Sequence, residues 1–336
     1  MANLYDYQGN VISAGGSVEI ADNLTTNSST TALSAAQGVV LKNMVNVPSP
    51  IPSGLTQYPY NGVSIDIATQ RNFAVQQIKT LSNYHTWQGG DCFGDYLFMF
   101  TENNTTCWVI NMSTGQQLQA IDIPSNQRGF VSNCHCDTVN FSSKYYSDTD
   151  SFPLIYVSTG YPAKVDDVYY SAALVYRIIV TEENGQTSYS LELVQTIKIE
   201  SQKWSEFVVG GNNDAYIKLL DDVHHIKLPE LSDGSEIIID FSDEYNMYRI
   251  SPNPISPLQG AKFLNGKIIR TAGAPGTGEG KAYLLSLNPL SGSWDAILPI
   301  GAAGNYGGEP EALFVWNNKL CVVFRSSGRV WAIYTT

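Results

Sequence analysis

The fold can be inferred from residues 87–123, which have the sequence WQGGDCFGDYLFMFTENNTTCWVINMSTGQQLQAIDI. An apolar run at 96–100 is followed by a polar turn, a second β-rich run at 107–111, a Ser-Thr-Gly turn, and a third run at 118–123. Short runs rich in β-branched and aromatic residues, bounded by turn residues, predict strands. Three or four such strands in about 40 residues, repeated in tandem, are typical of the blades of a β-propeller.

The same pattern returns until the C-terminus. Further units are predicted at about 133–199, 206–241, 259–300 and 311–336. The second unit is lengthened by loops at 142–151 and 161–170, and the outer strand of the third unit is predicted at 236–241. The chain is therefore expected to be an all-β protein with one large repeat domain.

The last unit lacks an outer strand, and a matching strand lies near the start of the domain. Residues 74–79 (AVQQIK) are similar to residues 193–198 (LVQTIK), the predicted outer strand of the second unit. Pairing 74–79 with the C-terminal strands would close the ring and leave no free sheet edge. We therefore predict a five-bladed β-propeller over residues 63–336, with six blades as the alternative if 63–67 and the long second unit contain another blade.

Residues 1–46 differ from the repeats and are predicted to be a separate attachment or oligomerisation segment. A short helix capped within residues 29–31 is expected there, because apolar residues recur at spacings of three and four: Leu33, Ala36, Val40 and Met44. A helix of this length is not stable alone, so its apolar stripe should pack on another copy or on its own domain. Residues 47–62, VPSPIPSGLTQYPYNG, form a Pro-rich linker.

This N-terminal part resembles known phage proteins. The sequence DNLTT at 22–26, followed by TALSAAQGVVLK at 31–42, resembles a segment of phage and prophage tail-fibre and minor structural proteins. The opening ANLYDYQGNVI at 2–12 resembles the start of phage structural proteins that carry varied C-terminal modules. The resemblance implies a virion-tail protein made in the bacterial cytoplasm, with a distal receptor-binding or enzymatic part; the residues alone also fit an ordinary capping helix of a bacterial protein.

The composition limits the partners. A formal net charge of −12 does not favour binding to nucleic acid or to anionic lipid, so sugars, neutral polymers and proteins are the expected partners. Neither a signal-peptide pattern nor an apolar run of about 18 residues is present, so we expect no membrane insertion. The cysteines are expected to be buried free thiols: Cys92, Cys107, Cys134, Cys136 and Cys321.

A ligand site is predicted where the inner strands begin, at one mouth of the central channel. Aligning the units on their turns at 94–95, 213–214, 265–266 and 317–318 brings polar residues to one structural position. With nearby aromatic residues, the predicted ligand-binding set is Trp87, Gln88, His135, Asp137, Trp204, Glu206, Gln259, Tyr306 and Glu311. Aromatic faces stack on sugar rings while amides and carboxylates bind hydroxyls. Alternatively, these residues only solvate a water-filled channel.

The carboxylates also fit glycosidase chemistry, which needs two acids across a scissile bond. The candidate acids are Asp91, Asp137, Glu206, Glu309 and Glu311. The run Cys134-His135-Cys136-Asp137 is a poor metal motif, because successive residues of a strand alternate sides and only the two cysteines share a face. We expect no metal and no cofactor.

These features predict a tail-associated receptor-binding protein that oligomerises through its N-terminal segment, contacts other virion tail proteins and binds a cell-surface glycan with its propeller. Two alternatives remain open from the residues. One is a glycoside hydrolase that cleaves a surface polysaccharide, and the other is a non-catalytic scaffold that binds only proteins.

Overall fold

The structure is a computed structural model of the 336-residue chain, which divides into two compact units, Met1–Pro50 and Ile51–Thr336. In the first unit two short strands, β1 (Ile20–Ala21) and β2 (Ala32–Leu33), pair in parallel. The residues that the structure describes are 20–21, 32–33, 73–82, 87–130, 134–202, 204–211, 213–219, 222–239, 241, 246–249, 255–275, 280–325 and 327–335.

The predicted N-terminal helix overlaps the described residues only at Ala32 and Leu33, which are extended. Both residue types favour helices, but pairing with β1 keeps them in a strand, as tertiary contacts often override intrinsic propensity. The rest of that predicted helix, the predicted linker at 47–62 and the segment 63–67 lie outside the described residues.

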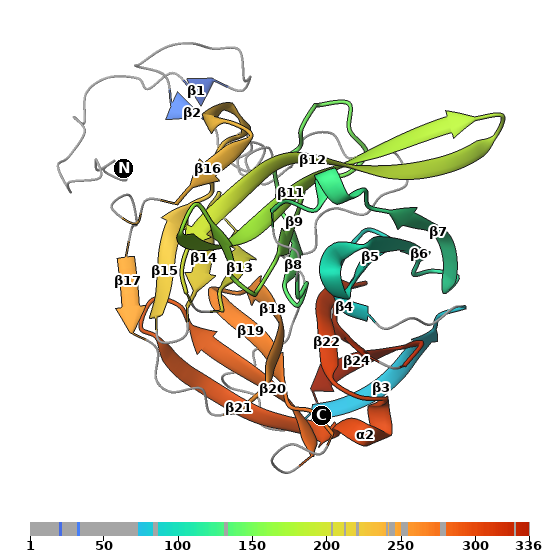
Figure 1. Cartoon of the computed structure of the whole chain (residues 1–336). Coiled ribbons are helices and arrows are strands. Elements are labelled where there is room, and N and C mark those ends of the chain that lie inside the picture. The colour runs from blue at the N-terminus through green and yellow to red at the C-terminus, as the bar shows by residue number, and fades with distance from the viewer. Residues whose placement is uncertain are drawn as a thin grey trace. The chain divides into compact units, whose positions relative to one another are not determined.

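The second unit is a five-bladed β-propeller, as predicted (Figure 1). Blade 1 contains β4 (Trp87–Phe93), β5 (Tyr96–Thr101), β6 (Thr106–Asn111) and β7 (Gln116–Asp122). Blade 2 contains β8 (Val139–Phe141), β9 (Ile155–Ser158), β10 (Ala163–Val165), β11 (Val168–Glu183), β12 (Gln186–Glu200) and β16 (Glu236–Ile238). Blade 3 contains β13 (Glu206–Val209), β14 (Asp214–Lys218), β15 (Asp222–Lys227) and β17 (Asn246–Arg249).

Blades 4 and 5 complete the ring. Blade 4 contains β18 (Leu258–Leu264), β19 (Lys267–Ala272), β20 (Lys281–Asn288) and β21 (Ser293–Ala302). Blade 5 contains β22 (Pro310–Trp316), β23 (Lys319–Phe324), β24 (Arg329–Thr335) and β3 (Phe73–Thr80). The described helices are short: η2 (Glu102–Asn104), η3 (Ser125–Gln127), η4 (Leu231–Asp233) and α2 (Ala303–Tyr306). None of the described helices is long and apolar enough to cross a membrane.

The ring closes as the sequence predicts. Strand β3, from the start of the domain, pairs antiparallel with β24 at its end, with Phe73 opposite Thr335 and Thr80 opposite Arg329. Pairing of the chain's two ends within one sheet removes the free edges that an open ring would leave. Tight turns support the blades: Asn265 and Gly266 between β18 and β19 both have positive φ, which is the geometry of a type I′ hairpin.

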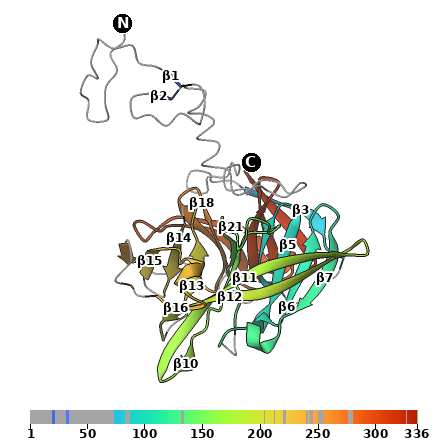
Figure 2. The same ribbon diagram turned by 90° about the horizontal axis from the view of Figure 1, so that it is seen from above.

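Blade 2 differs most from the prediction. Strands β11 and β12 span 16 and 15 residues and form a hairpin that extends beyond the blade toward β7 (Figures 1 and 2). The region 161–170, predicted to be a loop, contains β10 and the start of β11, which pair antiparallel.

The outer strand predicted for blade 3 at 236–241 is wrong. Its first part, β16, instead joins blade 2 in parallel with β12, and β17 takes the outer position of blade 3. Side chains on β12 hold the preceding segment: Gln195 Nε2 donates to the carbonyls of Glu230 and Gly234, and Lys198 pairs with Glu236 at 2.7 Å. A short β-rich run specifies an extended conformation but not the sheet edge that it joins.

Buried polar side chains join the inner strands at the centre of the ring. Asp91 on β4 forms an ion pair with Lys262 on β18 and accepts hydrogen bonds from the amides of Cys92 (2.8 Å) and Phe141 (2.7 Å). Asn140 on β8 donates to the carbonyl of Ala261 at 3.0 Å and accepts from the amide of Val209 at 3.1 Å. These contacts tie blades 1 to 4 together.

Candidate functional site

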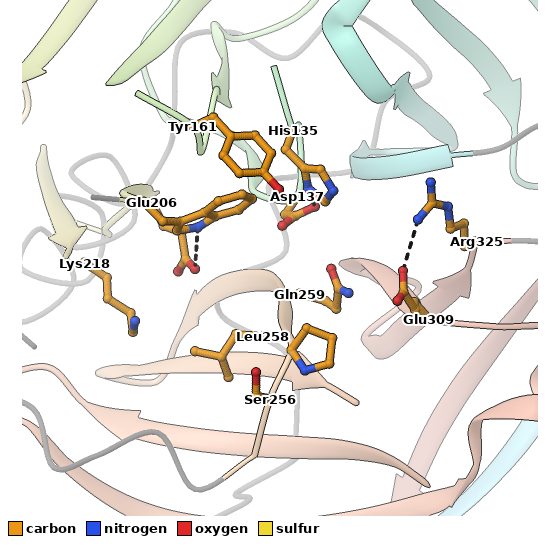
Figure 3. Close-up of a pocket in the computed structure, with 12 residues that line it drawn as sticks. His135, Asp137, Tyr161, Glu206, Lys218, Ser256, Leu258, Gln259, Glu309 and Arg325 are labelled. Carbon is orange, nitrogen blue, oxygen red and sulfur yellow. Dashed lines mark hydrogen bonds and ion pairs between the residues drawn. The ribbon is translucent and has the colours of Figure 1, made fainter. Parts of the chain in front are cut away.

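A cavity of about 350 Å³ opens where the inner strands begin (Figure 3). Its walls come from the residues that precede or start β8, β13, β18 and β22, together with two loops and β14. The lining residues are His135, Asp137, Tyr161, Trp204, Glu206, Lys218, Ser256, Pro257, Leu258, Gln259, Glu309 and Arg325. The mouth of the propeller is therefore a pocket with charged, amide and aromatic groups.

One side of this pocket is an acidic wall, which we define as Asp137, Glu309 and Glu311. Asp137 pairs with His135, whose Nδ1 lies 2.5 Å from its Oδ1. When the Gln88 amide is assigned with its nitrogen facing the two buried acids, which its neighbours require, that nitrogen donates to Asp137 Oδ1 at 3.0 Å and to Glu311 Oε2 at 3.3 Å. Both carboxyls therefore lie within hydrogen-bonding distance of a single amide nitrogen.

Two acids of this wall, Asp137 and Glu311, have raised pKa values. Burial raises the pKa of Asp137 to about 6, although the hydrogen bond and charge of His135 act in the opposite direction. Burial, followed by the charge of Asp137 and the neighbouring carboxyl of Glu309, raises the pKa of Glu311 well above its ordinary value. Desolvation disfavours a carboxylate, and nearby carboxylates add to that effect.

His135 and Arg325 supply positive charge to the acidic wall. Burial alone would lower the pKa of His135, but its hydrogen bond with Asp137 and the charges of Asp137 and Glu102 together outweigh burial, and the pKa is raised. Arg325 lies 3.2 Å from Glu309 and 3.2 Å from Glu102, so one guanidinium serves two carboxylates. Among the described residues, no Lys, Arg or His nitrogen lies within ion-pair distance of Glu311.

The opposite side of the pocket is charge-balanced. Glu206 forms a two-point ion pair with the buried Arg270, whose second nitrogen lies 2.7 Å from Glu206 Oε1, and Trp204 Nε1 donates to the same oxygen at 3.2 Å. Burial alone would raise the pKa of Glu206, but the charges of Arg270 and Lys218 overcome it and the pKa is lowered. Glu206 is therefore held ionised, whereas Asp137 in the same pocket keeps a proton up to a pH of about 6.

An aromatic wall joins the two sides. Trp204 and Tyr161 pack edge to face with ring centroids 4.7 Å apart, and the His135 ring lies 5.2 Å from Trp204. Gly160 makes this packing feasible, because a Cβ atom there would lie 2.8 Å from the Trp204 ring and its φ of +70° disfavours other residues.

The pocket also contains an unpaired amide oxygen. Gln259 is 3% exposed, and among the described residues its Oε1 has no hydrogen-bond partner. Figure 3 shows this amide pointing into the space between Asp137 and Glu309. A buried polar atom without a partner costs free energy, so it is a natural contact for a ligand donor.

The structure brings most of the predicted site residues together. His135, Asp137, Trp204, Glu206 and Gln259 line the pocket, as does Glu309 from the set of candidate acids. Gln88 and Glu311 are buried and do not line the pocket themselves; the Gln88 amide links Glu311 to Asp137, which does.

Three of the candidates lie elsewhere. Trp87 is fully buried in an apolar cluster with Met99 and Phe314, and the ring of Tyr306 stacks on Phe324 while its hydroxyl donates to the Ile300 carbonyl at 2.7 Å. Neither lines the pocket, because each is held between sheets rather than at the axis. Asp91 is buried in the centre of the ring, where it pairs with Lys262.

Six lining residues lie outside the predicted set: Tyr161, Lys218, Ser256, Pro257, Leu258 and Arg325. Tyr161 and Arg325 follow second strands of their blades rather than precede inner ones, Lys218 ends β14, and Pro257 directly precedes β18. Lys218 reaches the pocket because it lies directly opposite Glu206 in the β13–β14 hairpin, and the backbone amide of Arg325 likewise donates to the carbonyl of Glu309. The Cys134-Cys136 pair lies directly under this site, with sulfurs 3.2 Å apart and both thiols buried, and all five cysteines are free, as expected. Among the described residues, no group of three or more potential metal ligands is found.

Comparisons with known proteins bear on the two units separately. Residues 20–50 match the family model of phage tail fiber repeats, which confirms the resemblance seen in the N-terminal sequence. No curated protein matches the chain. The chain therefore carries a phage tail fiber repeat segment together with a five-bladed propeller.

Several solved structures are similar to the propeller. A glutaminyl cyclase of Myxococcus xanthus is 10% identical with a TM-score of 0.46, covering 79% of this chain and 97% of that one. A protein of unknown function from Bacteroides caccae is 12% identical with a TM-score of 0.35, covering 70% and 69%. The WD40 β-propeller domain of Doa1 is 10% identical with a TM-score of 0.34, covering 77% and 96%. These identities are too low to indicate a shared function.

Proposed function

We propose that this protein is a tail-associated receptor-binding protein whose propeller binds a cell-surface glycan in the mouth pocket. The tail fiber repeat at 20–50 supports the association with a phage tail. The observation that carries the binding proposal is the combination, in one pocket, of an aromatic wall with carboxyl, amide and basic groups at the starts of the inner strands.

The pocket has the chemistry that sugars require. Sugar rings present apolar C–H faces, which pack on aromatic side chains, and hydroxyls, which pair with amides and carboxylates. Trp204 and Tyr161 provide the first kind of contact, and Gln259 provides an open acceptor for the second. A volume of about 350 Å³ falls at the lower end of ligand pockets, which are about 300 to 1,000 Å³, and is suited to one or two sugar units.

Attachment of several copies to one tail would strengthen adhesion even where each binding site is weak. We propose that residues 1–46 attach the protein to other tail proteins and bring several copies together. Linked copies raise the effective concentration of the second site, so avidity can exceed single-site affinity by about 100-fold or more. A modest pocket on each propeller then suffices for stable adhesion to a surface that repeats the same glycan.

A second candidate function, glycan cleavage, has one observation in its favour. Within one pocket, Asp137 has a raised pKa and Glu206 a lowered one, which is the division that a general acid and an ionised partner need. Against this function, both oxygens of Glu206 are already engaged by Arg270 and Trp204. A carboxylate held in this way is a poor nucleophile or base, so binding is the better-supported function.

Native mass spectrometry of the full chain mixed with polysaccharides from bacterial surfaces separates the alternatives. Intact protein–glycan complexes with unchanged glycan mass would support an adhesin. Progressive shortening of the glycan that Asp137→Asn abolishes would support the hydrolase instead. Absence of both signals across a broad panel would overturn glycan binding and favour a protein scaffold.

A further inference from the structure

We propose that the acidic wall of the mouth pocket binds a primary ammonium group, and that the glycan recognised by this protein therefore contains an unacetylated amino sugar. This inference rests on the proposed function and specifies its ligand. It follows from the charges, the unpaired acceptors and the aromatic side chains of the pocket.

The charges of the pocket are unevenly distributed. On the balanced side, Glu206 faces Arg270 and Lys218. On the acidic wall, Asp137 pairs with His135, Glu309 shares Arg325 with Glu102, and Glu311 forms no ion pair among the described residues, although the charge of Arg325 acts on it. The carboxyls of this side therefore outnumber its basic groups, His135 and Arg325, and a bound cation would improve the balance.

The unpaired acceptor lies beside the same wall. Gln259 Oε1 is buried and, within the described part of the chain, has no donor; its amide points between Asp137 and Glu309. An ammonium group has three N–H donors and no acceptor, so it can satisfy this oxygen and the two facing carboxyls together. A hydroxyl has only one proton to donate and could serve only one of these three groups.

Aromatic faces complete the site. Trp204 and Tyr161 line the same pocket as the acidic wall, and the His135 ring packs against both. Tryptophan and tyrosine rings attract cations through the negative potential of their faces, by about 0.5 to 2 kcal/mol. An amino sugar can stack its ring on these side chains while its ammonium group meets the acids.

Release of protons on binding would distinguish an ammonium ligand from a neutral one. In the free protein at pH 6, Asp137 is partly protonated and the raised pKa of Glu311 favours its protonated form, because burial disfavours both charges. A bound cation favours the ionised acids and therefore expels protons. The groups that face these acids are His135 before β8, Glu206 on β13, Arg270 on β19, Gln88 on β4, and Glu309 and Arg325 beside β22.

The test is isothermal titration calorimetry of the full chain at pH 6 with two matched probes, a glucosamine hexasaccharide and an N-acetylglucosamine hexasaccharide. Titrations in two buffers of different ionisation enthalpy count the protons exchanged. We expect the amine-bearing probe to bind at least tenfold more tightly and to release protons into the buffer. Equal or tighter binding of the acetylated probe would overturn the ammonium site while leaving glycan binding intact.

Variants locate the site. Glu309→Gln removes a carboxyl that faces the pocket, and we expect it to abolish most of the preference for the amine. Glu311→Gln replaces a buried protonated acid by a neutral side chain of the same shape, so it should fold normally and reduce the number of protons released. Glu182→Gln, which makes the same charge change at an exposed position on the β11–β12 hairpin, is the matched control.

The remaining outcomes separate this inference from the proposed function. Amine binding that is unchanged in Glu309→Gln would overturn the assignment to the acidic wall. Binding of neither hexasaccharide, when another glycan forms a complex in native mass spectrometry, would overturn the amino sugar and leave the adhesin standing. Binding of the diamine cadaverine that depends on Glu309, with no glycan bound, would overturn the glycan part of both proposals.

Discussion

The centre of the propeller and its mouth are built from the same inner strands, yet buried carboxyls are paired differently in the two regions. In the centre, Asp91 has a cation, Lys262, and two amide donors. At the mouth, Glu311 is equally buried but forms no ion pair among the described residues. Burial raises the pKa of both acids; the paired Lys262 opposes the shift at Asp91, whereas at Glu311 neighbouring carboxyls add to the shift and Arg325 opposes it through its charge without an ion pair.

The difference separates structural polar groups from groups available to a ligand. Polar contacts in the centre are completed within the chain, so they join blades and leave nothing for another molecule. At the mouth, the acids retain protons and Gln259 retains an open oxygen. Incomplete pairing of buried polar groups lowers the stability of the fold, and proteins tolerate it mainly at functional sites.

The largest effect is expected from Lys262→Met, which leaves Asp91 buried without its cation. Breaking a buried ion pair by removing one partner costs about 3 to 5 kcal/mol, measurable as a shift in the urea unfolding midpoint. The double variant Asp91→Asn with Lys262→Met removes the stranded charge and should recover most of that loss. A single variant as stable as the parent protein would show that the pair is not a structural link.

A smaller, pH-dependent effect is expected from Asp137→Asn at the mouth. Because the folded pKa of about 6 lies above the ordinary 3.8, the folded protein holds a proton that the unfolded chain loses, and stability falls as pH rises between these values. Asparagine does not titrate, so the variant should gain stability relative to the parent by up to about 3 kcal/mol between pH 4 and pH 7. Thermal unfolding at both pH values measures this gain.

A stability gain for Asp137→Asn that is the same at both pH values would contradict the raised pKa. His135→Gln at pH 7 provides a useful companion, since it removes the partner that opposes the shift and should increase the cost of the Asp137 charge. The two variants together test whether burial or the ion pair dominates at the mouth.

The smallest effect on stability is expected from Gln259→Met. The Gln259 side-chain oxygen has no partner in the described structure, so replacing the amide by an apolar group of similar length should change the unfolding free energy by less than about 1 kcal/mol. Glycan affinity should nevertheless fall about tenfold, which corresponds to 1.4 kcal/mol, because a ligand donor loses its acceptor. Unchanged affinity, measured by calorimetry, would remove Gln259 from the binding site.

Much of this architecture follows from the sequence because blades repeat locally. The tandem strand pattern predicts five blades, and the similarity of 74–79 to 193–198 predicts the closing strand that pairs with β24. Aligning the hairpin turns brings Glu206 and Gln259 to one level of the ring, and both line the pocket. Because the units repeat, the strand assignment in one blade can be tested against the same positions in the other blades.

What the sequence does not predict depends on contacts between distant segments. Strand β16 joins blade 2 through Gln195 and Lys198, and neither contact has a local signature. Arg325 and Lys218 reach the mouth as cross-strand neighbours of Glu309 and Glu206, which depends on the register of each hairpin.

The predicted aromatic residues could have been sorted by strand alternation. Successive side chains of a strand point to opposite faces, so Trp87, next to the axis-facing Gln88, lies between sheets. Trp204 is two residues from Glu206, and the pairs His135–Asp137 and Glu309–Glu311 have the same spacing, so their members lie on one side. The pKa values also required the folded structure, since burial sets them.

The most direct test of the account compares two tryptophans at the two ends of the inner strands. Trp204 lines the mouth, whereas Trp316 ends β22 at its opposite end, where its Nε1 donates to Asp95 at 2.9 Å. The glycan that binds the parent protein would be titrated calorimetrically into Trp204→Ala and into Trp316→Ala. We expect Trp204→Ala to bind it about 10-fold to 100-fold more weakly than the parent, a loss of about 1.4 to 2.8 kcal/mol, and Trp316→Ala to bind it as tightly as the parent. Equal affinity for both variants, with both folded, would contradict a glycan site at the mouth of the propeller.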